Sequence, residues 1–135
     1  MQITKFKFKK HNSDLGDLVF LEANRDVPFD VKRVYYIYGV DNDVRRGLHA
    51  HKELHQALIC LNGSCRIVLD DGTERVEVLL DDPSEGLHVG NRIWREMYDF
   101  SPGSVLLVLA SEYYDKQDYI FEYDEFLDYI GEAKK

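Results

Sequence analysis

Short apolar segments separated by turn residues run through most of this chain, and they limit the folds that it can adopt. Their residues are largely β-branched or aromatic and recur with period two, which favours strands. The dipeptides between them, such as Asn62-Gly63 and Pro102-Gly103, favour tight turns. The segments that we expect to be strands are 31–40, 55–61, 64–70, 73–80, 86–90 and 104–111. Many short antiparallel strands at this spacing predict an all-β sandwich or barrel.

The C-terminal region has a different periodicity. From residue 118 onward, apolar residues recur at helical spacing, at Tyr119, Tyr123, Phe126, Leu127 and Ile130. This spacing predicts a short helix over 118–131 that lies on the outside of the β-structure, with Asp118 as its N-cap and Gly131 at its end. We expect the tyrosines of this helix to serve packing rather than ligand binding.

Length and charge limit the classes of function. The 135 residues suit a single domain, 1–135, and the formal net charge of −8 argues against nucleic acid as a partner. A few local arginines could still hold a small anionic ligand. The N-terminus lacks an apolar leader, and the longest apolar run, 105–110, is too short to span a bilayer. We therefore expect a cytoplasmic protein that does not enter a membrane.

Two cysteines flank the Asn62-Gly63 turn. If this turn closes a two-residue hairpin, Cys60 lies directly opposite Cys65, within reach of a disulfide bond. A cytoplasmic location favours two reduced thiols that act as small core residues.

The stretch RRGLHAHKELHQ, residues 45–56, carries the most distinctive polar pattern. His49 and His51 are two residues apart, so they share a face of a strand. Gln56 joins that face if a turn or bulge intervenes within KELH, residues 52–55. In that register Gln56, Leu58 and Cys60 line the same interior as the two histidines, and His55 points outward.

This spacing is that of the first cupin motif, with Gln56 in place of the usual glutamate. The second motif places its histidine three residues after a glycine, but in the segment GLHVGNRIWREM that position is Ile93, and His88 precedes the glycine. No histidine follows later in the chain. Because transition-metal sites normally use three or four protein ligands, we expect no metal and no other cofactor. The plain alternative is that the two histidines form a polar strand face. Arg46, which lies beside them, and Arg33 and Tyr35, which share a face on a neighbouring predicted strand, favour a ligand site instead.

At RGLH the sequence resembles the sugar-nucleotide 3,5-epimerases. A closer resemblance, over nearly the whole chain, is to the dTDP-4-keto-6-deoxyglucose 3,4-ketoisomerases. It is carried by the segments FDVKRVYYIYGV, RRGLHAHKELHQALICLNGSCRIVLDDG, GLHVGNRIWREMYDF and VLLVLASEYYDKQDYI. The resemblance implies a cupin-type jelly-roll barrel, a metal-free site, a dTDP-linked 4-keto-6-deoxy sugar as substrate, and a homodimer that exchanges its N-terminal strand, here within KFKFKK. By position, His49 and His51 match the catalytic histidines, and Arg46 matches the arginine that holds the pyrophosphate in the epimerases.

The residues suit a keto-isomerisation. Moving a ketone from C4 to C3 requires a base of near-neutral pKa, together with donors that stabilise an enediolate. We expect His51 to be the base and His49 its partner at the sugar oxygens, with Tyr35 as a third catalytic group. Arg33, Arg46 and Gln56 are expected to bind substrate. A 3,5-epimerase and a non-catalytic sugar-binding cupin remain alternatives.

Two further positions concern the configuration of the product at C4. In the family that this chain resembles, members that form the galacto product carry an arginine and a histidine at these positions. Members that form the gluco product carry a tyrosine and an arginine there. Leu15 and Arg95 occupy them here. The chain therefore agrees with the gluco pattern at one position and with neither pattern at the other, and we favour the gluco product.

Overall fold

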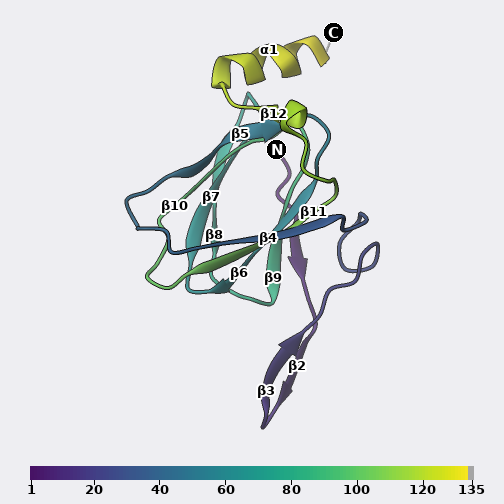
Figure 1. Cartoon of the computed structure of the whole chain (residues 1–135), viewed down its shortest axis with the longest axis vertical. Coiled ribbons are helices and arrows are strands. Elements are labelled where there is room, and N and C mark those ends of the chain that lie inside the picture. Colours follow the sequence, from purple (N-terminus) through teal and green to yellow (C-terminus); the bar gives the residue numbers. More distant parts are fainter. Residues whose placement is uncertain (134–135) are drawn as a thin grey trace.

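Two antiparallel sheets face each other in the computed structural model, which describes residues 1–133 (Figure 1). The first sheet contains, in spatial order, β1 (Lys5–Lys7), β9 (Glu85–Val89), β6 (Gln56–Asn62), β11 (Val105–Ala110) and β4 (Arg33–Tyr38). The second contains β12 (Tyr119–Ile120), β5 (Arg46–His51), β10 (Trp94–Tyr98), β7 (Cys65–Asp70) and β8 (Arg75–Leu80). From β4 to β12 the chain crosses repeatedly between the two sheets. This is a cupin-type jelly roll, and the all-β prediction is confirmed.

The main core lies between the sheets and follows from the alternation of residues along the strands. In β4, Arg33, Tyr35 and Ile37 face inward and alternate with exposed residues, as the period-two pattern predicts. Central strands contribute nearly continuous apolar residues to this core, among them Leu58, Cys60, Cys65, Ile67, Leu69, Leu87, Met97, Leu106 and Val108. Burial of these side chains between the sheets supplies most of the driving force for folding.

The Asn62-Gly63 turn does not close a hairpin of paired strands, so that expectation was wrong. It connects strands of different sheets, since β6 pairs with β9 and β11 while β7 pairs with β8 and β10. Gly63 has a φ of 71°, a conformation that glycine adopts without strain. Cys60 and Cys65 are both free thiols within the same core.

The C-terminal helix is shorter than predicted and starts later. Residues 116–118 form a 3-10 turn (η1, Lys116–Asp118), residues 119–120 form β12, and the helix α1 spans Tyr123–Ala133. Asp118 is therefore not its N-cap, and Gly131 lies inside it rather than at its end. The physical reason is tertiary: Tyr119 and Ile120 pair with His51 and Ala50 of β5, which holds the chain extended.

One face of α1 packs on the outside of the second sheet, as expected. Phe126 and Ile130 lie with Ala50, Trp94 and Ile120 in a separate core cluster. A polar contact ties the start of the helix to the sheet, because the hydroxyl of Tyr123 donates to Oδ2 of Asp70 at 2.8 Å. Arg75 Nε donates to the same carboxylate oxygen at 3.0 Å. No helix among residues 1–133 is long and apolar enough to cross a membrane.

The N-terminal region has two parts, a strand that pairs with the barrel and a hairpin that projects from it. β1, within the segment expected to be exchanged, pairs with β9 of its own chain. The next two strands, β2 (Lys10–Ser13) and β3 (Gly16–Val19), form a hairpin that projects away from the barrel (Figure 1). Its tip residue, Leu15, has a relative exposure of 99%.

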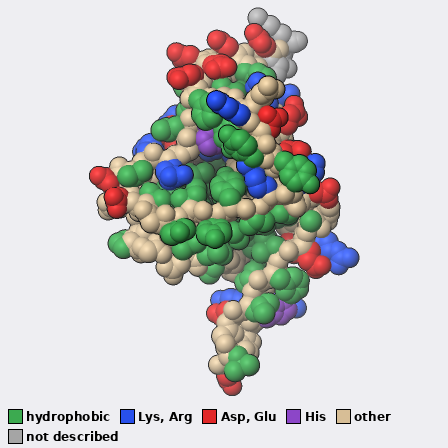
Figure 2. All heavy atoms as spheres, in the orientation of Figure 1, with side chains coloured by type: hydrophobic (Ala, Val, Ile, Leu, Met, Phe, Trp, Pro, Cys, Tyr) green, Lys and Arg blue, Asp and Glu red, His purple; other side chains and the backbone are tan. Residues whose placement is uncertain are grey.

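Apolar side chains continue from this hairpin onto the outer face of the first sheet. Figure 2 shows hydrophobic side chains gathered over the β4 region of the barrel and along the hairpin. Those of β4 are Val34, Tyr36 and Tyr38, which are all more than half exposed at 55%, 63% and 69%. A contiguous apolar face of this kind marks an interaction surface more often than a solvated one.

Candidate active site

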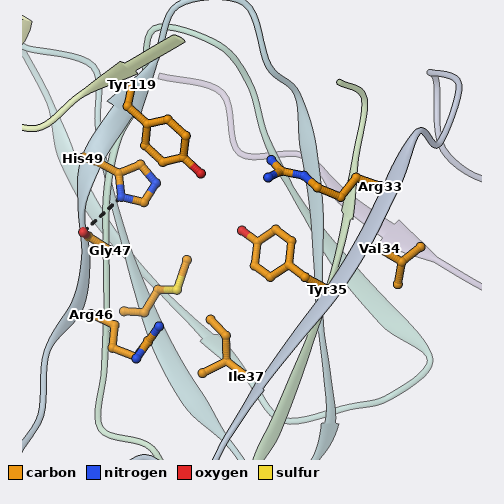
Figure 3. A pocket seen from close by; sticks show the side chains of 9 residues that line it. Arg33, Val34, Tyr35, Ile37, Arg46, Gly47, His49 and Tyr119 are labelled. Atoms are coloured by element: carbon orange, nitrogen blue, oxygen red, sulfur yellow. Dashed lines mark hydrogen bonds between the residues drawn. The ribbon is translucent and has the colours of Figure 1, made fainter. Parts of the chain in front are cut away.

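A pocket of about 290 Å³ opens between β4 and β5, on the inner side of the barrel (Figure 3). It is lined by Arg33, Val34, Tyr35, Ile37, Arg46, Gly47, His49, Met97 and Tyr119. Arg33 and Tyr35 lie across the pocket from His49 and Arg46 (Figure 3). β4 and β5 are consecutive in the chain but belong to opposite sheets. The predicted side chains nevertheless converge, because the two strands face each other.

A β-bulge in β5 brings Arg46 and His49 to the same side. The register of β5 against β10 passes from His49 opposite Arg95 to Gly47 opposite Glu96, so Leu48 is the extra residue. An unbulged strand would send residues 46 and 49 to opposite faces. Gly47 has a φ of 81°, and a Cβ there would lie 3.1 Å from the carbonyl oxygen of Arg95. Both features favour glycine at this position.

The two histidines lie together and each has one ring nitrogen engaged. Their ring centroids are 4.9 Å apart and the rings are nearly perpendicular. Nδ1 of His49 lies 3.0 Å from the carbonyl oxygen of Gly47 (Figure 3), and Nδ1 of His51 lies 2.9 Å from Oδ2 of Asp118. Because a carbonyl and a carboxylate accept, both Nδ1 atoms carry the proton when the rings are neutral. The Nε2 atom of each ring then keeps its lone pair.

The surroundings of the histidines favour their neutral, basic form. Burial lowers the pKa of His49 from 6.5 to about 4, and the positive charge of Arg95 adds to this effect. Burial also lowers the pKa of His51 far below its ordinary value, again with help from Arg95. The contact between His51 and Asp118 is therefore a hydrogen bond from a neutral imidazole, and it fixes the tautomer of the ring.

Gln56 and Arg95 lie beneath the pocket rather than on its wall. The side chain of Gln56 is 1% exposed and that of Arg95 is fully buried. Arg95 donates to Oε1 of Gln56, and Nε2 of Gln56 donates to the hydroxyl of Tyr35 at 2.8 Å. Direct contact of Gln56 or Arg95 with substrate stays a prediction. Arg95 is therefore not an exposed residue at the end of a strand.

The arginines at the pocket are placed to meet an anion. Arg46 is exposed at the pocket rim on β5, and Arg33 faces it from β4. The guanidinium of Arg33 lies 5.4 Å from the ring centroid of Tyr35 and 5.7 Å from that of Tyr114. Its Nε is buried without a hydrogen-bond partner among the described residues. Buried donors in proteins are normally paired, so a ligand acceptor would complete this environment.

Two residues of the site, Asp118 and Tyr119, were assigned to the C-terminal helix in the sequence. Tyr119 lines the pocket, with its ring centroid 4.3 Å from that of His51 and 5.0 Å from that of His49. Asp118 bonds His51 through Oδ2 and accepts from the backbone N–H of Glu53 through Oδ1 at 2.8 Å. The expectation that Tyr119 lies in the helix was wrong, because it belongs to β12. The sequence gives one signal for a different role of Asp118 and Tyr119, which is that the polar stretch 115–118 directly precedes the apolar residues at helical spacing.

Two other residues lie apart from the pocket. His55, excluded on strand parity, contacts His88 with its Nδ1 3.2 Å from Nε2 of that ring. Leu15 lies at the tip of the projecting hairpin, away from the pocket of its own chain (Figure 1). A role for Leu15 in this pocket requires a second copy of the chain.

The donor set does not fit a divalent metal. Cupin-type metal sites add a carboxylate and a third histidine to the HxH pair, whereas Gln56 here offers an amide that is already bonded on both sides. Within residues 1–133, no group of three or more His, Cys, Asp or Glu side chains is arranged to hold a metal ion.

This cupin-type barrel has a pocket lined by the neutral imidazole of His49, with that of His51 packed against it, and by a phenol and two arginines. Such an arrangement can support acid–base chemistry on a small anionic molecule. The chain belongs to the family described as "FdtA: WxcM-like, C-terminal", which it matches over residues 1–131.

Relatives in this family are similar over nearly the whole chain. The curated TDP-4-oxo-6-deoxy-alpha-D-glucose-3,4-oxoisomerase of Aneurinibacillus thermoaerophilus is 51% identical over 131 residues, which are 97% of this chain and 94% of that protein. A mutant of the 3,4-ketoisomerase QdtA from Thermoanaerobacterium thermosaccharolyticum, solved in complex with TDP-4-keto-6-deoxyglucose, has a TM-score of 0.94 and 52% identity, with 96% of this chain and 94% of that chain covered. The WlaRB TDP-quinovose 3,4-ketoisomerase from Campylobacter jejuni has a TM-score of 0.90 and 47% identity, with 93% and 97% covered.

Proposed function

We propose that this protein is a sugar 3,4-ketoisomerase that converts TDP-4-keto-6-deoxyglucose to a TDP-3-keto-6-deoxyhexose. The observation that carries the proposal is the pair of neutral imidazoles, each with Nε2 unprotonated, beside a pocket that also presents Tyr35 and two arginines. The names of the relatives supply the substrate class. Family membership favours this reaction over the 3,5-epimerase and over a non-catalytic sugar-binding protein.

His49 is the better candidate for the base. The sequence favoured His51, but His49 lines the pocket, whereas His51 is 1% exposed and lies outside the pocket lining. Nε2 of His49 takes the proton from C3, which is acidic because it is alpha to the ketone, and an enediolate forms. The same imidazolium then returns the proton to C4, and the ketone is left at C3. His51, held by Asp118, lies against His49 and fixes its environment.

The other pocket residues act on the oxygens and on the nucleotide. The hydroxyl of Tyr35 donates to the enediolate oxygens and carries the proton that must move between them. Arg33 and Arg46 bind the diphosphate, which positions the sugar and supplies binding energy remote from the reacting carbons.

Incubation with TDP-4-keto-6-deoxyglucose in the presence of a chelator tests the reaction directly. Nuclear magnetic resonance of the sugar carbons should show the ketone moving from C4 to C3 without loss of activity on chelation. Exchange at C5 instead would indicate the epimerase, and binding without turnover would indicate a sugar-binding protein. His49→Asn should lower kcat by about 10²–10⁴-fold while the protein folds normally, because positioned acid–base groups contribute that much. His55→Asn is the matched control and should retain kcat.

The product is proposed to have the gluco configuration at C4. Arg95 agrees with that pattern, and its buried charge lies directly across the β5–β10 ladder from His49. The side chain of Leu15 cannot form a hydrogen bond that would favour the sugar orientation leading to the galacto product. Conversion of the product by a 3-aminotransferase allows the H3–H4 coupling to be measured. A large coupling, from diaxial protons, supports the gluco product, and a small one contradicts it.

A homodimer completes the proposed enzyme. The projecting hairpin exposes Leu15, Leu18 and Phe20, and β4 exposes its own apolar face. We propose that a second copy covers both surfaces and that the Leu15 of each chain acts at the pocket of its partner. Exchange of the N-terminal strand, a cytoplasmic location and the absence of nucleic acid partners stay predictions.

A further inference from the structure

We propose that Gln56 is a positioning residue that sets the direction of a hydrogen-bond chain from Arg95 to Tyr35, so that the hydroxyl proton of Tyr35 is directed into the pocket. This inference rests on the proposed function, because it explains how one donor for the enediolate is prepared before substrate binds. It gives Gln56 a task different from substrate contact.

The chain starts at a buried cation whose position is fixed. Arg95 is fully buried, and its Nη2 donates to the carbonyl oxygens of Ile93 at 3.0 Å and Gly90 at 3.4 Å. Its Nη1 donates to Oε1 of Gln56. Among residues 1–133, no carboxylate forms an ion pair with Arg95. A neutral side chain, rather than a counter-ion, therefore meets the guanidinium.

The chemistry of the donors determines the direction of every bond that follows. A guanidinium has donors and no acceptor, so the atom of Gln56 that faces it must be the amide oxygen. The amide nitrogen then faces Tyr35, 2.8 Å from the phenol oxygen. Because that nitrogen can only donate, the phenol oxygen must accept. The hydroxyl proton of Tyr35 cannot lie on the line toward Gln56.

The proton of Tyr35 therefore points toward another acceptor. Tyr35 lines the pocket, and its hydroxyl lies on the side that faces His49 and Tyr119 (Figure 3). Burial raises the pKa of Tyr35, so the phenol keeps this proton at neutral pH. The oxygen of Tyr35 accepts a hydrogen bond from Gln56, which in turn accepts one from the Arg95 cation. These bonds polarise the O–H group of Tyr35 and make it a stronger donor. The result is a preset donor for a sugar oxygen that becomes negative.

The glutamate usual at this cupin position would reverse the last bond. A carboxylate accepts from both sides, so it would pair with Arg95 and take the hydroxyl proton of Tyr35 for itself. The phenol would then present an oxygen lone pair to the pocket instead of a proton. Gln56→Glu is therefore a nearly isosteric change that should preserve folding and abolish the donor.

The experiment compares four proteins: wild type, Tyr35→Phe, Gln56→Glu and the double variant. Thermal unfolding checks that each is folded, and a chelator is present because a carboxylate beside two histidines could recruit a metal ion. Gln56→Glu should lower kcat by at least about 10-fold with little change in KM, since a general acid contributes about 10²–10⁴-fold. In the Tyr35→Phe background the same substitution should change kcat by less than about 2-fold, because residues that act as a unit are non-additive.

The outcomes separate the inference from the reaction on which it rests. Wild-type kcat in Gln56→Glu would overturn the inference, and so would an equal loss from that substitution in the Tyr35→Phe background. Either result leaves the isomerase intact. Absence of turnover by the wild-type protein would overturn the proposed function and the inference together.

Discussion

At the scale of single residues, the site depends on which nitrogen of each histidine is occupied. Gly47 and Asp118 engage the two Nδ1 atoms, and burial beside the charge of Arg95 disfavours protonation of both rings. A base that removes a proton from carbon must be neutral before the reaction starts. The environment therefore keeps His49 in the form that its proposed role as base requires over the whole neutral range of pH.

This arrangement predicts a particular pH dependence. Since the pKa of His49 is lowered to about 4, kcat/KM should stay constant from neutral pH downward and fall only as the pH approaches that value. The unfolded chain binds the proton near the ordinary pKa of 6.5, so the free energy of unfolding should decrease as the pH falls from 6.5 to about 4. Rate profiles and denaturant titrations across this range would measure both. A midpoint of kcat/KM near 6.5 would show that the histidine is not desolvated.

At the scale of elements, the bulge in β5 is the feature on which the pocket depends. It turns one residue out of the ladder, and so a guanidinium and an imidazole three residues apart reach the same cavity. Strand β12 has a comparable role, because its pairing with β5 carries Asp118 and Tyr119 to the histidines.

Replacement of Gly47 should therefore damage both stability and substrate binding. Gly47→Ala places a side chain at a φ of 81° and close to Arg95 O, and strain of this kind costs about 1–3 kcal/mol. Movement of the bulge would displace Arg46, so KM should rise more than kcat falls. Gly131→Ala is the matched control: its Cβ meets nothing within 4 Å, and alanine in a helix is favoured by about 0.5–1 kcal/mol. Equal stability changes in the two variants would contradict this account of Gly47.

The attachment of α1 gives a second prediction at this scale. Phe126 is fully buried between the helix and the second sheet, so Phe126→Ala should lower the free energy of unfolding by about 3–5 kcal/mol. Phe121 is 53% exposed, and Phe121→Ala should cost roughly 1 kcal/mol or less. Urea titrations of both variants would measure the difference. A small loss in Phe126→Ala would mean that the helix contributes little to stability.

At the scale of the whole molecule, the pocket lies inside the barrel, whereas Leu15, the candidate specificity residue, lies on the projecting hairpin. Leu15 lies at the tip of the hairpin of β2 and β3, which form a separate two-stranded sheet. A hairpin of this kind is marginally stable by itself. Its apolar side chains and those of β4 are both available for a second copy. Association would cover both surfaces at once.

Charges placed on these surfaces should separate the copies. Light scattering at micromolar concentration should give the mass of two chains for the wild type and of one chain for the Leu18→Glu/Tyr36→Glu variant. Leu79→Glu, on the exposed face of β8, is the control and should leave the dimer intact. If Leu15 acts in the partner's pocket, the separated chain should also lose its preference at C4. A wild-type monomer would contradict the proposal.

Local patterns in the sequence were enough to predict the all-β layers and much of the pocket. Period-two alternation placed Arg33 and Tyr35 on the inner face of β4, and the spacing of two placed both histidines inside the barrel. The turn within residues 52–55 returned Gln56 to the interior, as parity required. These features are local, since they follow from the geometry of a strand and from residues close together in the chain.

Contacts between distant segments could be found only in the folded chain. Asp118 reaches His51 across 67 residues, and Tyr119 enters the pocket because β12 joins the edge of a sheet. The helical pattern from residue 118 was misleading, because pairing with β5 outweighed the local preference of two residues. The roles of Gln56 and Arg95 depend equally on the fold, since burial beneath Tyr35 turns two polar side chains into a directed hydrogen-bond chain. Periodicity reports which face a side chain takes, whereas its partner is chosen by packing of the whole chain.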